Sequence, residues 1–134
     1  MASKPVIVGI CGGMAAGKKL FTQSLIHRLG SRGCNAQYVD QLTKHHIKEN
    51  SFACYIMKGL TLFTDQPKDY FDIKIFLDVE ADTRLCRMLE SSNSHDETRR
   101  IISRYQSLIR PYHLQAVIKQ RPLSDVCVNG PFHD

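Results

Sequence analysis

The sequence predicts an α/β fold in which a parallel sheet of about five strands is sandwiched by helices. Short apolar runs alternate with stretches of helical spacing, and a glycine-rich turn follows the first run directly. Strands that are covered on both faces are continuously apolar. Because crossovers between parallel strands are right-handed, the connecting helices are expected to pack against both faces of the sheet.

The predicted strands are the short apolar runs at residues 5–11, 35–39, 52–57, 73–77 and 125–128. The predicted helices lie at residues 18–29, 81–90, 97–109 and 112–120. We expect the first of these helices to be stopped by Gly30 and Gly33, and the third by Pro111, because proline lacks an amide donor and its ring clashes with the preceding turn. A chain of 134 residues is long enough to form one domain with its own core.

The composition, with 43% hydrophobic and 23% charged residues, is that of a globular protein. No apolar run is long enough for a membrane span or a signal peptide, so we expect no membrane association. An odd number of cysteines without a C-x-x-C pair indicates free thiols, a cytoplasmic location and no zinc site; they are Cys11, Cys34, Cys54, Cys86 and Cys127. The net charge of +5 suits phosphorylated ligands or nucleic acid, but it is also ordinary for a soluble protein.

A phosphate-binding loop is predicted between the first strand and the first helix. The pattern G-x-x-x-x-G-K is matched by Gly12, Gly13, Met14, Ala15, Ala16, Gly17 and Lys18. Glycines allow backbone amides to turn toward a phosphate, the helix N-terminus adds partial positive charge, and Lys18 is expected to reach the outer phosphates. The motif predicts a P-loop NTPase-type fold that binds ATP or another nucleotide. The alternative is a glycine-rich turn without a ligand.

The residue after Lys18 departs from the phosphate-loop pattern. A serine or threonine is required there to bind the magnesium ion that bridges the terminal phosphates. Lys19 supplies a positive charge but no oxygen ligand, so we count it with the nucleotide-binding residues and expect no metal ligand in the loop. This substitution predicts that phosphate binding survives and that magnesium-dependent transfer is impaired.

Several segments resemble the uridine–cytidine kinase family. Residues 5–21 resemble its opening strand and loop, G-G-x-x-x-G-K-[ST], and residues 69–85, DYFDIKIFLDVEADTRL, resemble its DLFDMKIFVDTDADTRL segment. Tyr105 with Arg110 and Pro111 resembles its QY…VKP helix end, and residues 124–130 resemble its ADVIIPRG strand. The resemblance covers most of the chain in order, and it implies an ATP-dependent kinase of pyrimidine nucleosides.

The resemblance also assigns a candidate catalytic residue. Asp40 matches the aspartate of the family's SQDSFY motif, which implies a general base acting on the 5′-hydroxyl of uridine or cytidine if the protein is active. The following residues differ from the motif. In the family's EGIL motif an acidic residue lies near the metal, and Lys58 replaces it here.

Other family segments are missing. Residues 41–57 leave no room for the family's long insertion, whose hairpin with the YDF…H.R motif resembles a nucleoside clamp. His45 and His46 are the nearby substitutes, with a solvated loop as the alternative interpretation. Residues 89–97 contain none of the family's lid arginines, and Arg99 and Arg100 follow on the next predicted helix. The resemblance therefore implies a single kinase-like domain, residues 1–134, without the hairpin and without the family's final helix.

Three functions remain open at this point. The favoured one is a degenerate kinase that binds nucleotide phosphates in a binding or regulatory role with lost or much reduced phosphoryl transfer, since such transfer depends on positioning and electrostatics. The second is an active nucleoside kinase with a pyrimidine nucleoside as partner. The third, a nucleic-acid-binding module, has only the basic charge in its support. A shortened chain that exposes sheet edges also suggests self-association or a protein partner.

Overall fold

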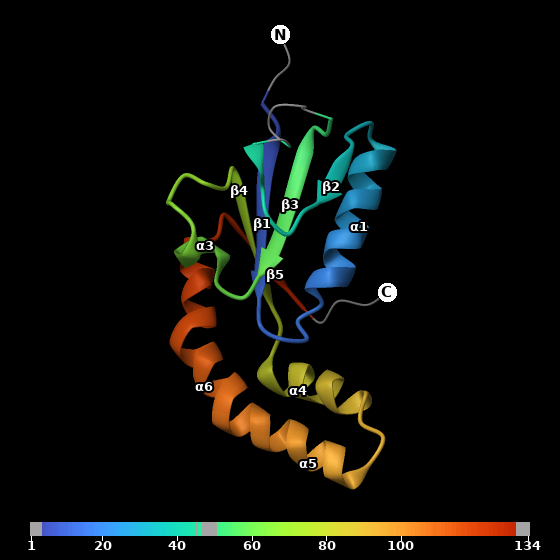
Figure 1. Ribbon diagram of the computed structural model, residues 1–134, viewed down its shortest axis with the longest axis vertical. Helices are drawn as coiled ribbons and strands as arrows, with labels where there is room; N and C mark the ends of the chain where they lie inside the picture. The colour runs from blue at the N-terminus through green and yellow to red at the C-terminus, as the bar shows by residue number, and fades with distance from the viewer. Residues whose placement is uncertain (1–3, 45, 47–50, 131–134) are drawn as a thin grey trace.

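The computed structural model describes residues 4–44, 46 and 51–130, and it contains a five-stranded, fully parallel sheet in the order β2-β3-β1-β4-β5 (Figure 1). The strands are β1 (Val6–Gly12), β2 (Ala36–Tyr38), β3 (Cys54–Gly59), β4 (Ile73–Asp78) and β5 (Val126–Asn129). The predicted fold class is confirmed, and each of these strands overlaps a predicted one.

Helical segments lie on both faces of the sheet, and further helices extend beyond one of its edges (Figure 1). They are α1 (Lys18–Ser31), α3 (Leu62–Asp65), α4 (Ala81–Glu90), α5 (His95–Arg104) and α6 (Arg110–Tyr112). Helix α1 packs against β1, β2 and β3 on one face, whereas α3 and the 3₁₀ segment Ile118–Leu123 pack against the other. The segment from α5 to Leu123 is continuously helical, because π-helical turns at Tyr105–Ile109 and His113–Val117 flank α6.

Strand β1 is the centre of the core. It pairs with β3 on one side and β4 on the other, and its side chains alternate between two hydrophobic clusters. Ile7 and Cys11 belong to the cluster under α3, while Val8 and Ile10 belong to the cluster under α1. A strand that is paired at both edges and buried on both faces gives the loop that follows it a rigid base.

Two predicted helix ends differ from the structure. Gly30 lies inside α1, which continues to Ser31, and Gly33 adopts a positive φ of 84° just beyond the helix. Pro111 does not end a helix but lies inside the continuous helical segment. The π-helical turn before it is wider than an α-helical turn, which relieves the clash of the proline ring and rearranges the backbone hydrogen bonds around the missing amide.

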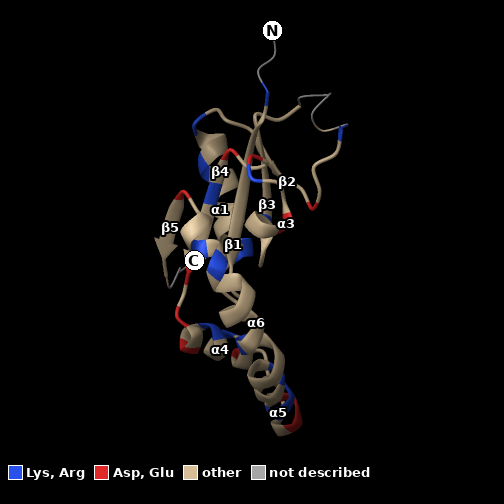
Figure 2. Cartoon of the chain, turned by 90° about the vertical axis from the view of Figure 1, so that its left-hand side faces the viewer, with Lys and Arg blue, Asp and Glu red and all other residues tan. Residues whose placement is uncertain are grey.

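The carboxyl ends of all five strands meet at one edge of the sheet. The connection after β1 runs to one side of it, toward β2, and the connection after β3 crosses to the other side, toward β4. Ligands of parallel α/β sheets bind where the connections diverge in this way. Helices α4, α5 and α6 extend beyond the same edge (Figures 1 and 2).

A buried glutamine joins the end of the helical segment to α3. Gln120, 1% exposed, accepts hydrogen bonds at Oε1 from the Phe63 amide (2.9 Å) and the Thr64 amide (3.2 Å). Its Nε2 donates to Thr64 Oγ1 at 2.8 Å and to the Ala116 carbonyl at 3.3 Å. The glutamine thus satisfies amides at the start of α3 that the short helix cannot satisfy itself.

We predict that Gln120→Leu lowers the free energy of unfolding by roughly 2 kcal/mol, because it leaves buried amides without acceptors. Urea unfolding followed by circular dichroism measures the change. Gln115→Leu, at an exposed position of the same segment, is the matched control and should change stability little. Equal stability of Gln120→Leu and the parent would contradict the role given to Gln120.

Candidate functional site

The loop between β1 and α1 has the backbone of a tight phosphate-binding turn. Ala15 and Gly17 have positive φ values of 61° and 95°, and the Ala16 amide donates to the Gly13 carbonyl at 3.2 Å. Gly17 adopts its conformation without steric cost, whereas Ala15 is held in a sparsely populated region. Gly17 is also the N-cap of α1, with no side-chain capping bond and no acidic residue in the first turn. The positive end of the α1 helix dipole is therefore not neutralised by a capping or acidic side chain of its own first turn.

Lys18 folds back over this loop. Its Nζ donates to the carbonyls of Gly12 (2.9 Å) and Gly13 (2.8 Å). The pKa of Lys18 is lowered to about 8, chiefly by burial and in smaller part by the positive charges of Lys58 and Arg84. At neutral pH the ammonium group is still mostly protonated, so a partly buried positive charge lies at the loop with only neutral carbonyls as hydrogen-bond acceptors.

Arg84 and His113 approach the loop from the helices beyond the sheet edge. A methyl group placed on Gly13 would lie 2.6 Å from Arg84 Nη1 and 2.9 Å from His113 Nδ1. Arg84 comes from α4 and is only 3% exposed, and its Nε donates to the Val79 carbonyl at 3.0 Å. Gly13 is therefore required here for close packing against two side chains rather than for a special φ.

A second arginine of α4 contacts the same loop. Arg87 Nη1 donates to the Ala15 carbonyl at 3.0 Å, which helps to hold the residue with positive φ. Arg84 and Arg87 are three positions apart and so lie on one face of the helix. The sequence patterns predict no site residue on α4. The three-residue spacing of the arginines was visible, but no pattern linked them to a loop about 70 positions earlier.

Asp40 follows β2 and is held by a tyrosine from that strand. Tyr38 Oη donates to Asp40 Oδ1 at 2.8 Å, and Lys58 Nζ lies 5.2 Å from the centre of the Tyr38 ring. Burial raises the pKa of Tyr38 to about 12, with a contribution from the hydrogen bond to Asp40 and its charge. Asp40 itself is exposed, and Lys58 is paired in register with Ile10 near the end of β1.

The remaining residues of the predicted phosphate-binding loop differ in their exposure to solvent. Met14 and Lys19 are exposed, and Gly12, Gly13 and Ala16 are buried. Thr22 is the next hydroxyl residue after Lys18, but its Oγ1 donates to the Lys18 carbonyl at 2.7 Å. The first turn of α1 therefore carries the exposed ammonium group of Lys19 at the position where the G-x-x-x-x-G-K-[ST] pattern has a hydroxyl.

Among the described residues, the candidate nucleoside contacts do not converge on one site. His45 lies outside the described residues, and His46 Nδ1 accepts from the Thr43 amide at 3.1 Å within its own turn. Arg99 and Arg100 are exposed on α5. Within residues 4–44, 46 and 51–130, no group of three or more His, Cys, Asp or Glu side chains is arranged to hold a metal ion. In the same residues, no helix is both long and apolar enough to cross a membrane.

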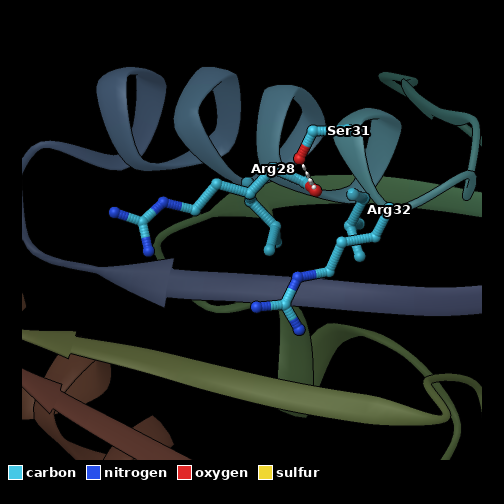
Figure 3. Close-up of a pocket in the computed structure, with 5 residues that line it drawn as sticks. Arg28, Ser31 and Arg32 are labelled. Carbon is cyan, nitrogen blue, oxygen red and sulfur yellow. Dashed lines mark hydrogen bonds between the residues drawn. The ribbon is translucent and has the colours of Figure 1, made fainter.

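A hollow on the surface lies along the C-terminal half of α1. Arg28 and Arg32, one turn apart, extend from the helix over the neighbouring strands, and Ser31 Oγ donates to the Arg28 carbonyl (Figure 3). Leu25 and Leu29 complete its lining. Because the phosphate loop precedes the other end of α1, this arginine pair is not part of the candidate site.

Comparison with known proteins gave relatives named uridine kinase, although no family model matches the chain. The uridine kinase of Chlamydia pneumoniae is 31% identical over 80 residues, which are 58% of this chain and 36% of that protein. The uridine kinase of Clostridium tetani is 21% identical over 193 positions that include all of this chain and 91% of that protein. The chain is similar to uridine kinases. As it has 134 residues, the longer alignment contains stretches of the relative without a counterpart here.

Solved structures confirm the fold. A putative fructose transport system kinase from Silicibacter sp. TM1040 superposes with a TM-score of 0.57 at 16% identity, covering 96% of this chain and 90% of the other. The protein TT1252 from Thermus thermophilus superposes with a TM-score of 0.59 at 10% identity, covering 97% and 91%. The architecture is an α/β P-loop NTPase fold.

The hydrogen bond between Tyr38 and Asp40 can be tested by titration. We predict that the Tyr38 pKa is about 12 in the parent and falls in Asp40→Asn, because the variant removes the charge that opposes formation of the tyrosinate. NMR-detected titration of the assigned Tyr38 ring measures it. Asp82→Asn, at an exposed position of α4, is the control. An unchanged Tyr38 pKa in Asp40→Asn would show that Tyr38 does not position this carboxylate.

Proposed function

We propose that this protein binds a nucleoside triphosphate, ATP or another nucleotide, by its phosphates at residues 12–19, and that its phosphoryl transfer is lost or much reduced. The observation that carries the proposal is the placement of Lys18 Nζ over the carbonyls of Gly12 and Gly13 at the N-terminus of α1. A polyphosphate offers this buried ammonium group charged acceptors, which form stronger hydrogen bonds than neutral carbonyls do. The similarity to uridine kinases supports the nucleotide-binding part of this proposal.

Binding is proposed to depend little on magnesium. Lys19 stands where a hydroxyl would bind the ion, and the Thr22 hydroxyl is directed to the backbone of its own helix. The ammonium group of Lys19 would also repel a divalent cation near the phosphates. The nucleotide's charge is then balanced by fixed side chains of the protein.

Reduced transfer is proposed because several elements of the reaction are altered together. Lys58 replaces an acidic residue of the resembling family, residues 89–97 carry no arginine, and the chain has no counterpart of the nucleoside-binding hairpin in residues 41–57. Phosphoryl transfer depends on the positions of charges and of the acceptor hydroxyl. In active kinases the altered elements position both the charges and the acceptor hydroxyl. Their alteration supports a binding or regulatory role, in which the protein would act through self-association or a protein partner.

The second candidate function is an active nucleoside kinase that phosphorylates the 5′-hydroxyl of uridine or cytidine. The observation in its favour is the carboxylate of Asp40, which Tyr38 holds by one oxygen while the residue remains exposed. A general base needs such an oriented and accessible carboxylate. A nucleic-acid-binding module, the third function open from the sequence, has no further support among the described contacts.

We predict that Lys18→Ala weakens ATP binding by about tenfold or more, because it removes a charged donor from the phosphates. Isothermal titration calorimetry with ATP measures the affinity. Lys68→Ala, an exposed lysine in the loop before β4, is the matched control and should bind like the parent. Equal ATP affinity in Lys18→Ala and the parent would remove the basis for the phosphate site.

Turnover separates the two candidate functions. We expect no nucleoside monophosphate, or only traces, when the parent is incubated with ATP, magnesium and either uridine or cytidine, with chromatographic detection of the product. Substantial product that disappears in Asp40→Asn, with ATP affinity retained, would establish the kinase with Asp40 as its base. Product formation that persists in Asp40→Asn would exclude Asp40 from that role.

A further inference from the structure

We propose that Arg84 and His113 are ligands of the nucleotide's terminal phosphoryl group, forming with residues 12–18 an anion site that binds without a divalent cation. This inference rests on the proposed function and deepens it. It assigns the charge-balancing groups to the helices beyond the sheet edge, where the sequence had suggested no phosphate ligand.

The first observation is an incompletely satisfied buried cation. Arg84 is only 3% exposed, and its Nε donates a hydrogen bond to the Val79 carbonyl. Its Nη1 is also buried, with no hydrogen-bond partner in the described part of the chain. A guanidinium group carries five donors and stays protonated in proteins. Such a group is stable in a buried position only if an anion or further acceptors satisfy it.

The second observation is an imidazole nitrogen beside it. His113 Nδ1 is the other buried side-chain atom without a partner among the described residues. The pKa of His113 is lowered to about 4, chiefly by burial and in smaller part by the positive charges of Arg84 and Lys18. The ring is therefore neutral at pH 7 and supplies one N–H donor without adding a second positive charge.

Both nitrogens converge on the phosphate loop. Arg84 Nη1 and His113 Nδ1 lie 2.6 Å and 2.9 Å from the position of a methyl group on Gly13, and the Gly13 carbonyl also accepts from Lys18 Nζ. Three side-chain nitrogens from three separate segments thus lie close to the glycine that follows β1. A multiply charged group bound at the loop would find several polar nitrogens within a short distance of one another.

The charges around this point do not cancel. Lys18 and Arg84 are within electrostatic range of each other and of His113. Asp78 is the carboxylate that acts on both Arg84 and His113, but its Oδ2 is paired with Arg121 Nη2 at 3.3 Å. The local excess is positive, which favours an anion with more than one charge. The terminal phosphoryl group of a nucleotide has this charge, and its oxygens match the fork of a guanidinium group.

The test is calorimetric titration of the intact chain with ATP, ADP and AMP in EDTA and again with magnesium. We expect the parent to bind ATP in EDTA, with less than a threefold gain from magnesium. Arg84→Gln and His113→Gln should each weaken ATP binding by about tenfold and reduce the preference for ATP over AMP. Arg110→Gln, at an exposed position of the same helical segment, is the control and should bind ATP like the parent.

The outcomes separate this inference from the proposed function. Parent-like ATP affinity in His113→Gln, together with loss of binding in Lys18→Ala, would overturn the inference and leave the phosphate loop assigned. No binding of ATP by the parent would overturn both. Thermal unfolding identifies an Arg84→Gln variant that fails to fold, and His113→Gln, at a half-buried position, then decides the question. A large gain from magnesium in the parent would overturn the cation-independent site.

Discussion

The absence of a side chain at Gly13 is the constraint on which the candidate site depends. The loop cannot move away from the helices, because β1 is paired on both sides and buried on both faces. The helices approach so closely that one added methyl group would overlap Arg84 and His113. Further contacts hold α4 in this position, from Arg84 Nε to the Val79 carbonyl and from Arg87 to the Ala15 carbonyl. The contacts at Gly13 and Ala15 therefore restrict movement of the loop relative to α4.

This rigidity has an electrostatic cost. Bringing a guanidinium group into a buried position removes its hydration, and the penalty is several kcal/mol unless acceptors replace the water. Here the Val79 carbonyl replaces part of the lost hydration of Arg84. The lowered pKa of Lys18 indicates that burial also destabilises the charged form of this lysine. An anion bound only by the folded chain would offset both penalties, so it would stabilise the fold as well as fill the site.

The elements that local patterns encode were predictable, and those that depend on distant contacts were not. The continuous apolar run of β1, the glycines and Lys18 of the loop, and the position of Asp40 after β2 follow from short segments. The passage of the helix through Pro111 depends on a π-helical turn that no periodicity signals. α3 is four residues long and is completed by Gln120 from 56 positions away. Arg84 and His113 reach the loop only because α4 and the segment after α5 fold beyond the sheet edge, which the sequence pattern does not specify.

The features that favour phosphate binding also work against transfer. A magnesium ion and mobile lid arginines can follow the phosphoryl group as charge moves during the reaction. Arg84 is fixed by burial and by its bond to Val79, and His113 is packed against Gly13, so neither can follow the moving group. Fixed donors that hold the ground state as strongly as the transition state increase affinity without increasing the rate of the chemical step. In the proposed site, Lys19 and the buried Arg84 would belong to one change, in which fixed positive side chains take over the charge balance that a metal ion provides in kinases.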